Sequence, residues 1–407
     1  MTDPTLVIVG ASVAGAKAAE AARTTGFDGR VVLIGEEHEP PYERPPLSKA
    51  VLRGEAAPET TRVQAEDFYL TNDIELLTGR TVEVLDVDTG RVRLDGNEQV
   101  PFSALVLATG AAPRRLDVPG VDLAGIHYLR SVGDAHRLGD AVRGGGRVAV
   151  VGAGWIGSEV AASARPMGAE VVLIDRAAVP LQRVLGHEVG EVFRSLHADN
   201  GVQLRSEAGV VELRGTGRVE QVVLSDGRTE AADVVVIGIG VIPRVGLAQA
   251  AGLKVDDGVV VDEHLRSSAP GVYAAGDVAS AWHPLYRQRL RVEHWANALN
   301  QGVTAGTNAA GGTDAYERLP YFFSDQYDLG LEYVGYGRPS DTVVVRGDRA
   351  QRELVAFWQR DGVVTAAMSV NVWDVVEDLR AIVASGGVVD ARRLADPTVP
   401  LTELVTR

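Results

Sequence analysis

Two short glycine-rich segments contain the residues whose types and spacing best suit ligand chemistry. They read GASVAG at residues 10–15 and GAGWIG at residues 152–157. Each follows an apolar run, at 5–9 and 147–151, of the kind that forms a buried parallel strand. A glycine turn between a strand and a helix lets backbone N–H groups approach a phosphate closely. Both segments therefore predict a pyrophosphate-binding turn, although Ser12 stands where the strict pattern has a glycine.

An acidic residue is expected after the second strand of each unit, where it accepts hydrogen bonds from a ribose. Glu36 follows the run at 31–34, and Asp175 follows the run at 171–174. One such motif is weak evidence, but two in the right context predict two dinucleotide-binding domains. Asp175 favours NADH because a carboxylate repels a 2′-phosphate. The adjacent Arg176 could bind that phosphate, but we favour a solvated arginine there.

The elements that position these residues predict an α/β fold, with two Rossmann-like domains and a smaller C-terminal α+β domain. Further strands are expected at 92–94, 104–108, 234–237 and 272–275. An antiparallel meander is expected at 342–345, 353–358 and 363–369, followed by a helix at 373–384. The predicted domain boundaries are 1–113 with 241–312, then 114–240, then 313–407.

Composition excludes several classes of function. The chain has 407 residues, a formal net charge of −15 and no cysteine. The negative charge argues against nucleic acid or an anionic membrane as partner. Without cysteine there is no disulfide, no thiolate metal ligand and no redox-active cysteine pair, and we expect no metal site. Because no signal-peptide pattern and no run of eighteen apolar residues occurs, we expect a cytoplasmic protein. Because no dimerisation segment is evident, we expect a monomer or a weak homodimer.

Longer segments narrow the prediction to one family. PYERPPLSK at 41–49, EHWANALNQ at 293–301 and PYFFSDQ at 320–326 closely resemble segments of the NADH-dependent ferredoxin reductases, as does GDVA at 276–279. Those enzymes serve haem-thiolate monooxygenases and Rieske-type dioxygenases, and the resemblance covers essentially the whole chain. One departure is Phe323, where many relatives have a tryptophan near the flavin. Phenylalanine keeps an apolar shield there but lacks the indole N–H.

The glycine turns and the resemblance together give the expected ligand-binding residues. FAD is expected at Gly10, Ser12, Ala14, Gly15, Glu36, Arg44, Lys49, Val82, Thr109, Gly110, Arg130, Gly276, Asp277, Glu293, His294 and Trp295. NADH is expected at Gly152, Gly154, Ile156, Gly157, Glu159, Asp175, Arg183 and Gly240. By resemblance, Lys49 lies near the flavin ring, Glu159 near the nicotinamide and Asp277 at the ribitol hydroxyls. The alternatives are that Lys49 only pairs with a carboxylate, and that Glu159 is a first-turn helix acid favoured by the dipole.

The resemblance implies electron transfer from NADH through FAD to a [2Fe–2S] ferredoxin, which we expect to be acidic. Hydride transfer from NADH to a flavin needs no protein acid or base, so no catalytic residue is assigned with certainty. Lys49 and Glu159 are the nearest candidates. A local basic patch is expected to dock the ferredoxin. The candidates for it are Arg287, Arg289 and Arg291, ahead of Arg392 and Arg393.

Three other functions use a similar architecture. A disulfide or peroxide reductase needs a redox cysteine, and the lack of cysteine excludes that class. A diaphorase or NADH oxidase would reduce quinones or oxygen without a protein partner. A redox-sensing protein would bind FAD and NAD and pass electrons on very slowly. The sequence leaves the last two open.

Overall fold

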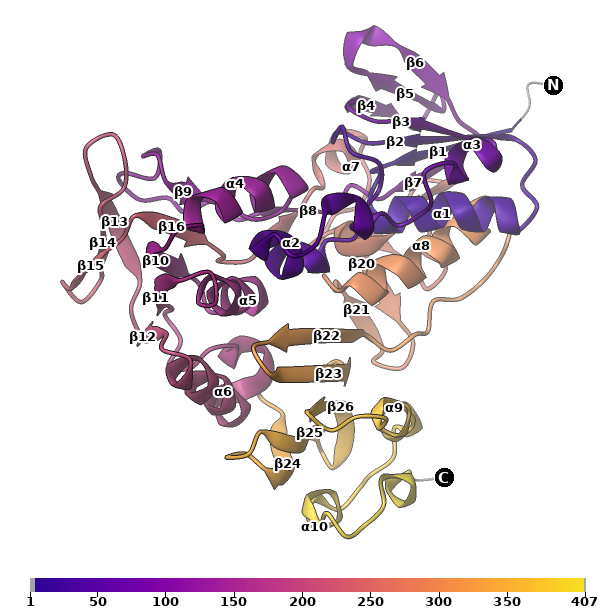
Figure 1. The fold of residues 1–407 in the computed structure, drawn as a ribbon. Coiled ribbons are helices and arrows are strands. Elements are labelled where there is room, and N and C mark those ends of the chain that lie inside the picture. Colours follow the sequence, from indigo (N-terminus) through magenta and orange to yellow (C-terminus); the bar gives the residue numbers. More distant parts are fainter. Residues whose placement is uncertain (1–3, 406–407) are drawn as a thin grey trace. The chain divides into compact units, whose positions relative to one another are not determined.

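A parallel five-stranded sheet is the centre of the first nucleotide-binding fold in the computed structural model, which describes residues 4–405 (Figure 1). Its strand order is β19–β7–β1–β2–β3, and the neighbouring strands run parallel. The strands are β1 (Thr5–Val9), β2 (Arg30–Ile34), β3 (Ile74–Leu77), β7 (Ala104–Leu107) and β19 (Val272–Ala274). Because the strand order reverses at β1, the carboxyl ends of β1 and β7 form the crevice at which such sheets bind ligands.

Two helices on this sheet cross at very short distance. α1 (Val13–Thr24) and α8 (Trp295–Ala309) lie side by side (Figure 1). A Cβ atom placed at Gly302 of α8 would lie 2.4 Å from the carbonyl oxygen of Ala14 in α1. One placed at Gly306 would lie 2.1 Å from the carbonyl oxygen of Ala18. The small residues therefore let the two backbones touch, and this fixes α8 against the helix that follows the first glycine turn.

Smaller elements complete the first unit. One antiparallel sheet consists of β4 (Val82–Asp86), β5 (Arg91–Leu94) and β6 (Gln99–Pro101). Another sheet consists of β18 (Val259–Val261), β20 (Ala279–His283) and β21 (Gln288–Leu290). The short helices are α3 (Phe68–Thr71) and α7 (Gly246–Ala250). Val92, Leu94 and Val100 of the first small sheet are buried in the same core as the parallel strands.

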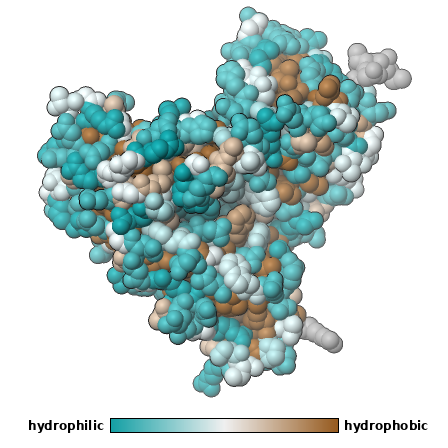
Figure 2. All heavy atoms as spheres, viewed as in Figure 1, coloured by the Kyte–Doolittle hydropathy of each residue, from teal (hydrophilic) through white to brown (hydrophobic). Residues whose placement is uncertain are grey.

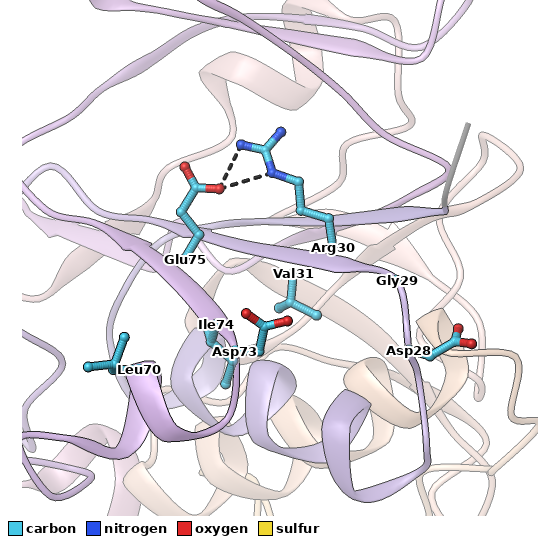
Figure 3. A pocket seen from close by; sticks show the side chains of 8 residues that line it. All are labelled: Asp28, Gly29, Arg30, Val31, Leu70, Asp73, Ile74 and Glu75. Carbon is cyan, nitrogen blue, oxygen red and sulfur yellow. Dashed lines mark hydrogen bonds and ion pairs between the residues drawn. The ribbon is translucent and has the colours of Figure 1, made fainter. Parts of the chain in front are cut away.

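A cavity of about 430 Å³ opens at the amino ends of β2 and β3 (Figure 3). It is lined by Asp28–Val31, Leu70 and Asp73–Glu75, and Arg30 and Glu75 form an ion pair of 2.6 Å beside it. Ligands of parallel α/β sheets bind at the carboxyl ends of the strands. This cavity lies at the opposite edge, so it is no candidate for a dinucleotide site.

The second nucleotide-binding fold repeats the first, with strand order β12–β11–β10–β16–β9. The strands are β9 (Ile126–His127), β10 (Gly146–Val151), β11 (Ala169–Ile174), β12 (Gln203–Arg205) and β16 (Val234–Ile237). Its helices are α4 (Val132–Val142) and α5 (Trp155–Ala164), and a small antiparallel sheet consists of β13 (Val210–Arg214), β14 (Gln221–Leu224) and β15 (Thr229–Ala231). Val148 and Val150 of β10 pack with the helices, whereas Ala149 and Val151 pack with the small sheet. Both faces are buried, which explains the unbroken apolar runs.

The C-terminal domain is an antiparallel sheet in the order β22–β23–β26–β25–β24. Its elements are β22 (Tyr321–Gln326), β23 (Leu329–Gly335), β24 (Thr342–Asp348), β25 (Glu353–Arg360), β26 (Val363–Val370), α9 (Val376–Ser385) and α10 (Ala391–Ala395). Helix α6 (Gln182–Asp199) of the second nucleotide-binding fold buries Leu185 and Phe193 in one core with Phe322 and Trp358 of this sheet. Figure 2 shows apolar atoms exposed over part of this domain, on a surface that is otherwise mostly hydrophilic.

The chain divides into two compact units. The first contains the chain up to Glu43, residues 59–112 and residues 242–320, and the second contains the remainder. The second unit therefore holds the second nucleotide-binding fold, the C-terminal domain and the segment with α2 (Ala50–Arg53). The pairing strands β8 (Ala111–Pro113) and β17 (Val241–Pro243) contain two of the points where the chain passes from one unit to the other. The three-domain boundaries stay a prediction.

The predicted α/β class, with its meander, is confirmed, and some boundaries differ. The helix predicted from residue 373 begins at Val376, because Asn371 and Asp374 adopt left-handed backbone angles, with φ of 50° and 61°. Periodicity alone does not predict the strands β22 and β23. Within residues 4–405, the structure contains no helix that is both long enough and apolar enough to cross a bilayer.

The contact between α1 and α8 gives a stability prediction. Gly306→Ala should lower the midpoint of thermal unfolding by a few degrees, because the added methyl group overlaps the Ala18 backbone and costs about 1–3 kcal/mol. Gly246→Ala is the matched control, since a methyl group added at that helical glycine would meet no atom within 4 Å. Equal midpoints for both variants, measured by calorimetry, would contradict the role given to this crossing.

Candidate functional site

The first glycine turn joins β1 to α1 and is shaped by backbone contacts. Gly10 has φ of +115°, and a Cβ atom there would lie 2.1 Å from the Ala108 carbonyl oxygen at the end of β7. A Cβ atom at Gly15 would lie 1.9 Å from the Gly10 carbonyl oxygen. Both positions therefore accept only glycine. The predicted residues Gly10 and Gly15 thus build the turn, and they bring the start of α1 to the crevice between β1 and β7.

The amino terminus of α1 suits an anion. Ser12 is the N-cap residue, but its side chain makes no capping hydrogen bond, and the first turn contains no acidic residue. The first backbone N–H groups of a helix lack intrahelical partners, and the helix dipole favours negative charge there. The turn thus fits a pyrophosphate, with serine tolerated at the middle position of the motif.

A second strand end converges on this turn. Gly276 follows β19 with φ of +78°, and a Cβ atom there would lie 3.1 Å from the Cβ atom of Ala14. The Gly276 N–H donates to Gln301 Oε1 at 2.9 Å, which ties this strand end to α8. The structure therefore brings Ala14, Gly276 and the adjoining Asp277 together, as the FAD prediction requires.

The start of α8 and the residue before it supply three more predicted FAD residues, Glu293, His294 and Trp295. His294 is the N-cap residue, and Trp295 is the first residue of the helix. Burial lowers the pKa of His294 to about 4, although the nearby Asp277 carboxylate acts in the opposite direction. His294 is therefore neutral at pH 7. Glu293 accepts a hydrogen bond of 2.6 Å from Arg291.

The predicted ribose acceptor Glu36 has a partner that the sequence reasoning missed. Arg244 forms an ion pair with the Glu36 carboxylate. The Arg244 carbonyl accepts the Thr109 hydroxyl at 2.9 Å, and its N–H donates to the Gly110 carbonyl at 2.9 Å. Arg244 therefore joins three predicted FAD residues. Its sequence separation of 208 residues from Glu36 gave no local signal for this contact.

The second glycine turn joins β10 to α5 and repeats the first. A Cβ atom at Gly152, where φ is +101°, would lie 2.4 Å from the Gly238 carbonyl oxygen, and one at Gly157 would lie 1.8 Å from the Gly152 carbonyl oxygen. Gly154 differs, because no atom lies within 4 Å of its Cβ position. Because glycine has no side chain, Gly154 borders open space, whereas Gly152 and Gly157 permit close backbone contacts. Open space at this position fits the predicted approach of a pyrophosphate to the backbone.

Asp175 fixes the shape of this second turn. Its carboxylate accepts the Ala153 N–H at 2.6 Å and the Ala177 N–H at 2.7 Å. The neighbouring Arg176 is exposed, and its guanidinium lies beside Gly209. The Asp175 carboxylate occupies the position expected to contact a ribose, and Arg176 is exposed, as predicted.

The remaining predicted NADH residues surround the turn. Ile156 is 44% exposed in the first turn of α5, and Arg183 is exposed in the first turn of α6. The segment between Asp175 and Arg183 is tied to the glycine turn, because the Leu181 N–H donates to the Ala153 carbonyl at 2.9 Å. Gly240 ends the turn that follows β16, with φ of +100°.

Glu159 is buried, and it is not an acid of the first helical turn, because α5 begins at Trp155 and its first turn contains no acidic residue. Its Oε2 atom accepts the Ser48 hydroxyl at 2.5 Å and lies 2.8 Å from the Lys49 ammonium. Its Oε1 atom accepts the Ser324 hydroxyl at 2.6 Å. The carboxylate that Lys49 pairs with is thus Glu159, so the two nearest catalytic candidates form one buried ion pair.

Three predicted FAD residues belong to the second unit. Arg44, Lys49 and Arg130 all lie there, and Arg44 donates a hydrogen bond to the Arg130 carbonyl. Val82 lies in the first unit, at the start of β4, and packs on its core. The approach of these four side chains to FAD stays a prediction. Among residues 4–405, no cluster of three metal-ligating side chains occurs.

The predicted docking arginines differ in their surroundings. Arg287 and Arg289 are exposed on the β20–β21 hairpin, where Arg289 lies opposite Trp282 in the register. The Arg291 side chain is only 12% exposed, and it forms ion pairs with Asp257 and Glu293. Arg291 therefore supports the local fold next to Glu293, and its charge is balanced.

Comparison with known proteins agrees with this geometry. The family model described as pyridine nucleotide-disulphide oxidoreductase matches residues 4–302, and the one described as reductase C-terminal matches residues 321–405. The ferredoxin–NAD(+) reductase component of an anthranilate 1,2-dioxygenase system from Burkholderia cepacia is 41% identical over 98% of both chains. Putidaredoxin reductase from Pseudomonas putida is 35% identical over 98% of this chain and 96% of its own. The crystal structure of a covalent putidaredoxin reductase–putidaredoxin complex superposes with a TM-score of 0.95 at 35% identity, covering 100% of this chain and 99% of that chain.

The open space at Gly154 gives a binding prediction. Gly154→Ala should raise the Kd for NADH about tenfold, or ~1.4 kcal/mol, because the new methyl group enters the space for the pyrophosphate. Its unfolding midpoint should stay unchanged, since the position is open and its φ of −78° suits alanine. Gly157→Ala should instead lower that midpoint, as its methyl group would overlap the Gly152 backbone. Calorimetric titration with NADH checks the first variant; wild-type affinity would contradict this interpretation of the turn.

Proposed function

Since this chain belongs to the pyridine nucleotide-disulphide oxidoreductase family and, within it, to the ferredoxin reductases, we propose that it transfers electrons from NADH through FAD to a [2Fe–2S] ferredoxin. That ferredoxin would in turn serve a haem-thiolate monooxygenase or a Rieske dioxygenase. The main supporting observation is the presence of two complete dinucleotide turns at the switch points of two parallel sheets. FAD supplies the step between a two-electron donor and a one-electron acceptor.

The residues of the chain bind and orient both dinucleotides in this proposal. The N-terminal turns of α1 and α5 hold the pyrophosphates, and Glu36 and Asp175 accept from the riboses. Asp277 accepts from the ribitol hydroxyls. Glu159 and Lys49 form a buried ion pair, and hydride transfer between the cofactors needs no protein acid or base. Alignment of the two cofactors is then the main contribution of the protein to rate.

The lack of cysteine separates this chain from the disulfide reductases after which its family is named. A disulfide substrate is reduced through a thiolate of the enzyme, which this chain cannot supply. A dithiol relay is therefore ruled out by composition, and the electron acceptor must take electrons from the flavin directly.

The function is tested by anaerobic titration of the purified protein with NADH and with NADPH, followed in the visible spectrum. We expect flavin absorbance that NADH bleaches rapidly, and cytochrome c reduction that depends on an added ferredoxin. A colourless protein that also fails to bind FAD would overturn the proposal. Turnover with ferricyanide but with no ferredoxin would favour a diaphorase, and very slow reoxidation by every acceptor would favour a redox sensor.

Asp175 gives a prediction on cofactor choice. The wild-type protein should prefer NADH, because the Asp175 carboxylate repels a 2′-phosphate. Asp175→Ser should lower the ratio of kcat/KM for NADH to kcat/KM for NADPH by about tenfold, since the repulsion is lost and Arg176 is exposed beside it. Steady-state assays with both cofactors check this. A strong preference of the wild-type protein for NADPH would show that Arg176, rather than Asp175, decides selectivity.

The docking surface gives a second functional prediction. We propose that Arg287 and Arg289 contact an acidic ferredoxin, since both are exposed and Arg289 lies opposite Trp282, and Arg and Trp are enriched among the residues that dominate binding energy at protein interfaces. Arg287→Glu should raise the KM for ferredoxin at least about threefold, more at low ionic strength, and leave ferricyanide reduction unchanged. Arg392→Glu, on α10, is the comparison. A larger effect of Arg392→Glu would move the docking site to the C-terminal domain.

A further inference from the structure

One face of strand β22 in the C-terminal domain has an aromatic and a polar side chain that contact the second nucleotide-binding fold. Its alternate residues Phe322 and Ser324 are buried. The Phe322 ring lies 4.5 Å from the Trp155 ring, measured between centroids, and Trp155 belongs to the second glycine turn. Two residues along, Ser324 donates to Glu159 of α5 at 2.6 Å. The C-terminal sheet thus touches the fold that is expected to hold NADH, at its turn and at its buried carboxylate.

The two serines that reach Glu159 come from distant parts of the sequence. Ser48 lies 111 residues before Glu159, and Ser324 lies 165 residues after it. Both serines are 1% exposed. Each donates to a different oxygen of the carboxylate, and Lys49 shares the oxygen that Ser48 uses. The carboxylate therefore cannot rotate without breaking one of these hydrogen bonds.

A buried ion pair of this kind is weak evidence for a contribution to stability. Replacing a buried ion pair by apolar residues of similar size is often neutral or stabilising, because both charges lose their hydration. A buried carboxylate held by two hydroxyls and one ammonium costs more to build than an apolar contact of the same size. It does fix the positions of two opposite charges, which an apolar contact cannot do.

We propose that Ser324 and Ser48 are positioning residues for the Glu159–Lys49 pair, and that the C-terminal sheet is through Ser324 part of the site of NADH oxidation. This inference rests on the proposed function, in which Glu159 and Lys49 lie where NADH and FAD meet. Ser324 acts through Glu159, to which its hydroxyl donates. Ser163 supports the same geometry, since its hydroxyl donates to the Ser48 carbonyl at 2.6 Å.

Removing the Ser324 hydroxyl leaves Glu159 Oε1 buried without its donor. The carboxylate must then turn toward its remaining donors, Ser48 and Lys49, which both contact Oε2. Lys49 moves with it, because the hydrogen bond of its ammonium to the Pro45 carbonyl is longer and weaker, at 3.3 Å. A small displacement of aligned groups lowers the rate of a transfer step more than it lowers affinity.

The test is rapid anaerobic mixing of the FAD-loaded protein with NADH, for wild type, Ser324→Ala, Ser324→Thr and Ser369→Ala. Ser369 is the matched control, since it is also 1% exposed in the same domain, and no hydrogen bond joins it to Glu159 in the described part of the chain. Ser324→Ala should lower the rate constant of flavin bleaching about tenfold, with the Kd for NADH changed less than about twofold. Ser324→Thr, which keeps the hydroxyl, should restore the rate, and Ser369→Ala should match wild type.

A second variant keeps the inference testable if Ser324→Ala fails to fold. Ser48→Ala removes the other hydroxyl and should slow bleaching in the same way. Bleaching at the wild-type rate in a folded Ser324→Ala or Ser48→Ala protein would overturn this inference but leave the proposed function standing. Equal slowing in Ser324→Ala and Ser369→Ala would also overturn it, because the effect would then come from general loosening of the sheet. A wild-type protein that NADH does not bleach would overturn the proposed function as well.

Discussion

Both nucleotide-binding folds depend on a close backbone contact between the first turn of a helix and the end of the preceding strand. In each fold the last glycine of the turn leaves less than 2 Å between a would-be Cβ atom and the carbonyl oxygen of the first glycine. Only hydrogen fits there. The direction of α1 and α5, and hence of their N–H groups, depends on this contact. In the first fold the dependence extends to α8, because Gly302 and Gly306 rest directly on the backbone of α1.

In the second unit, the positions of several elements depend on a buried ion pair. Glu159 and Lys49 are joined at 2.8 Å with side chains 5% and 15% exposed. Around them, the hydroxyl donors come from a loop and from the C-terminal sheet, and the aromatic contact of Trp155 with Phe322 lies close by. Apolar packing of α6 on the same sheet stabilises this assembly. The C-terminal domain therefore contributes the Ser324 side chain to the polar cluster around Glu159, in addition to packing on the nucleotide-binding fold.

For partner binding, the local arrangement of charged residues on this protein matters more than its net charge. With a net charge of −15 the chain has no overall attraction for an acidic partner, so only an exposed cluster of basic residues can contribute. Arginines that form ion pairs with neighbouring carboxylates are less available to bind a partner protein. Arg291 is balanced by Asp257 and Glu293, and Arg244 is paired with Glu36, whereas Arg287 and Arg289 are exposed on a hairpin.

The sequence alone determined the fold class, both glycine turns, their carboxylates and the family, because each of these is a local pattern. An apolar run, a turn with glycines at fixed spacing and an acid one strand later are all encoded within about thirty residues, as the βαβ unit requires. It did not determine the partners of those residues. The contacts of Glu159 with Ser48 and Ser324, of Glu36 with Arg244, and of Arg291 with Asp257 join segments that no periodicity relates. Only the tertiary structure decided them, because which buried polar groups meet depends on how whole elements pack, and burial then forces each group to find a partner.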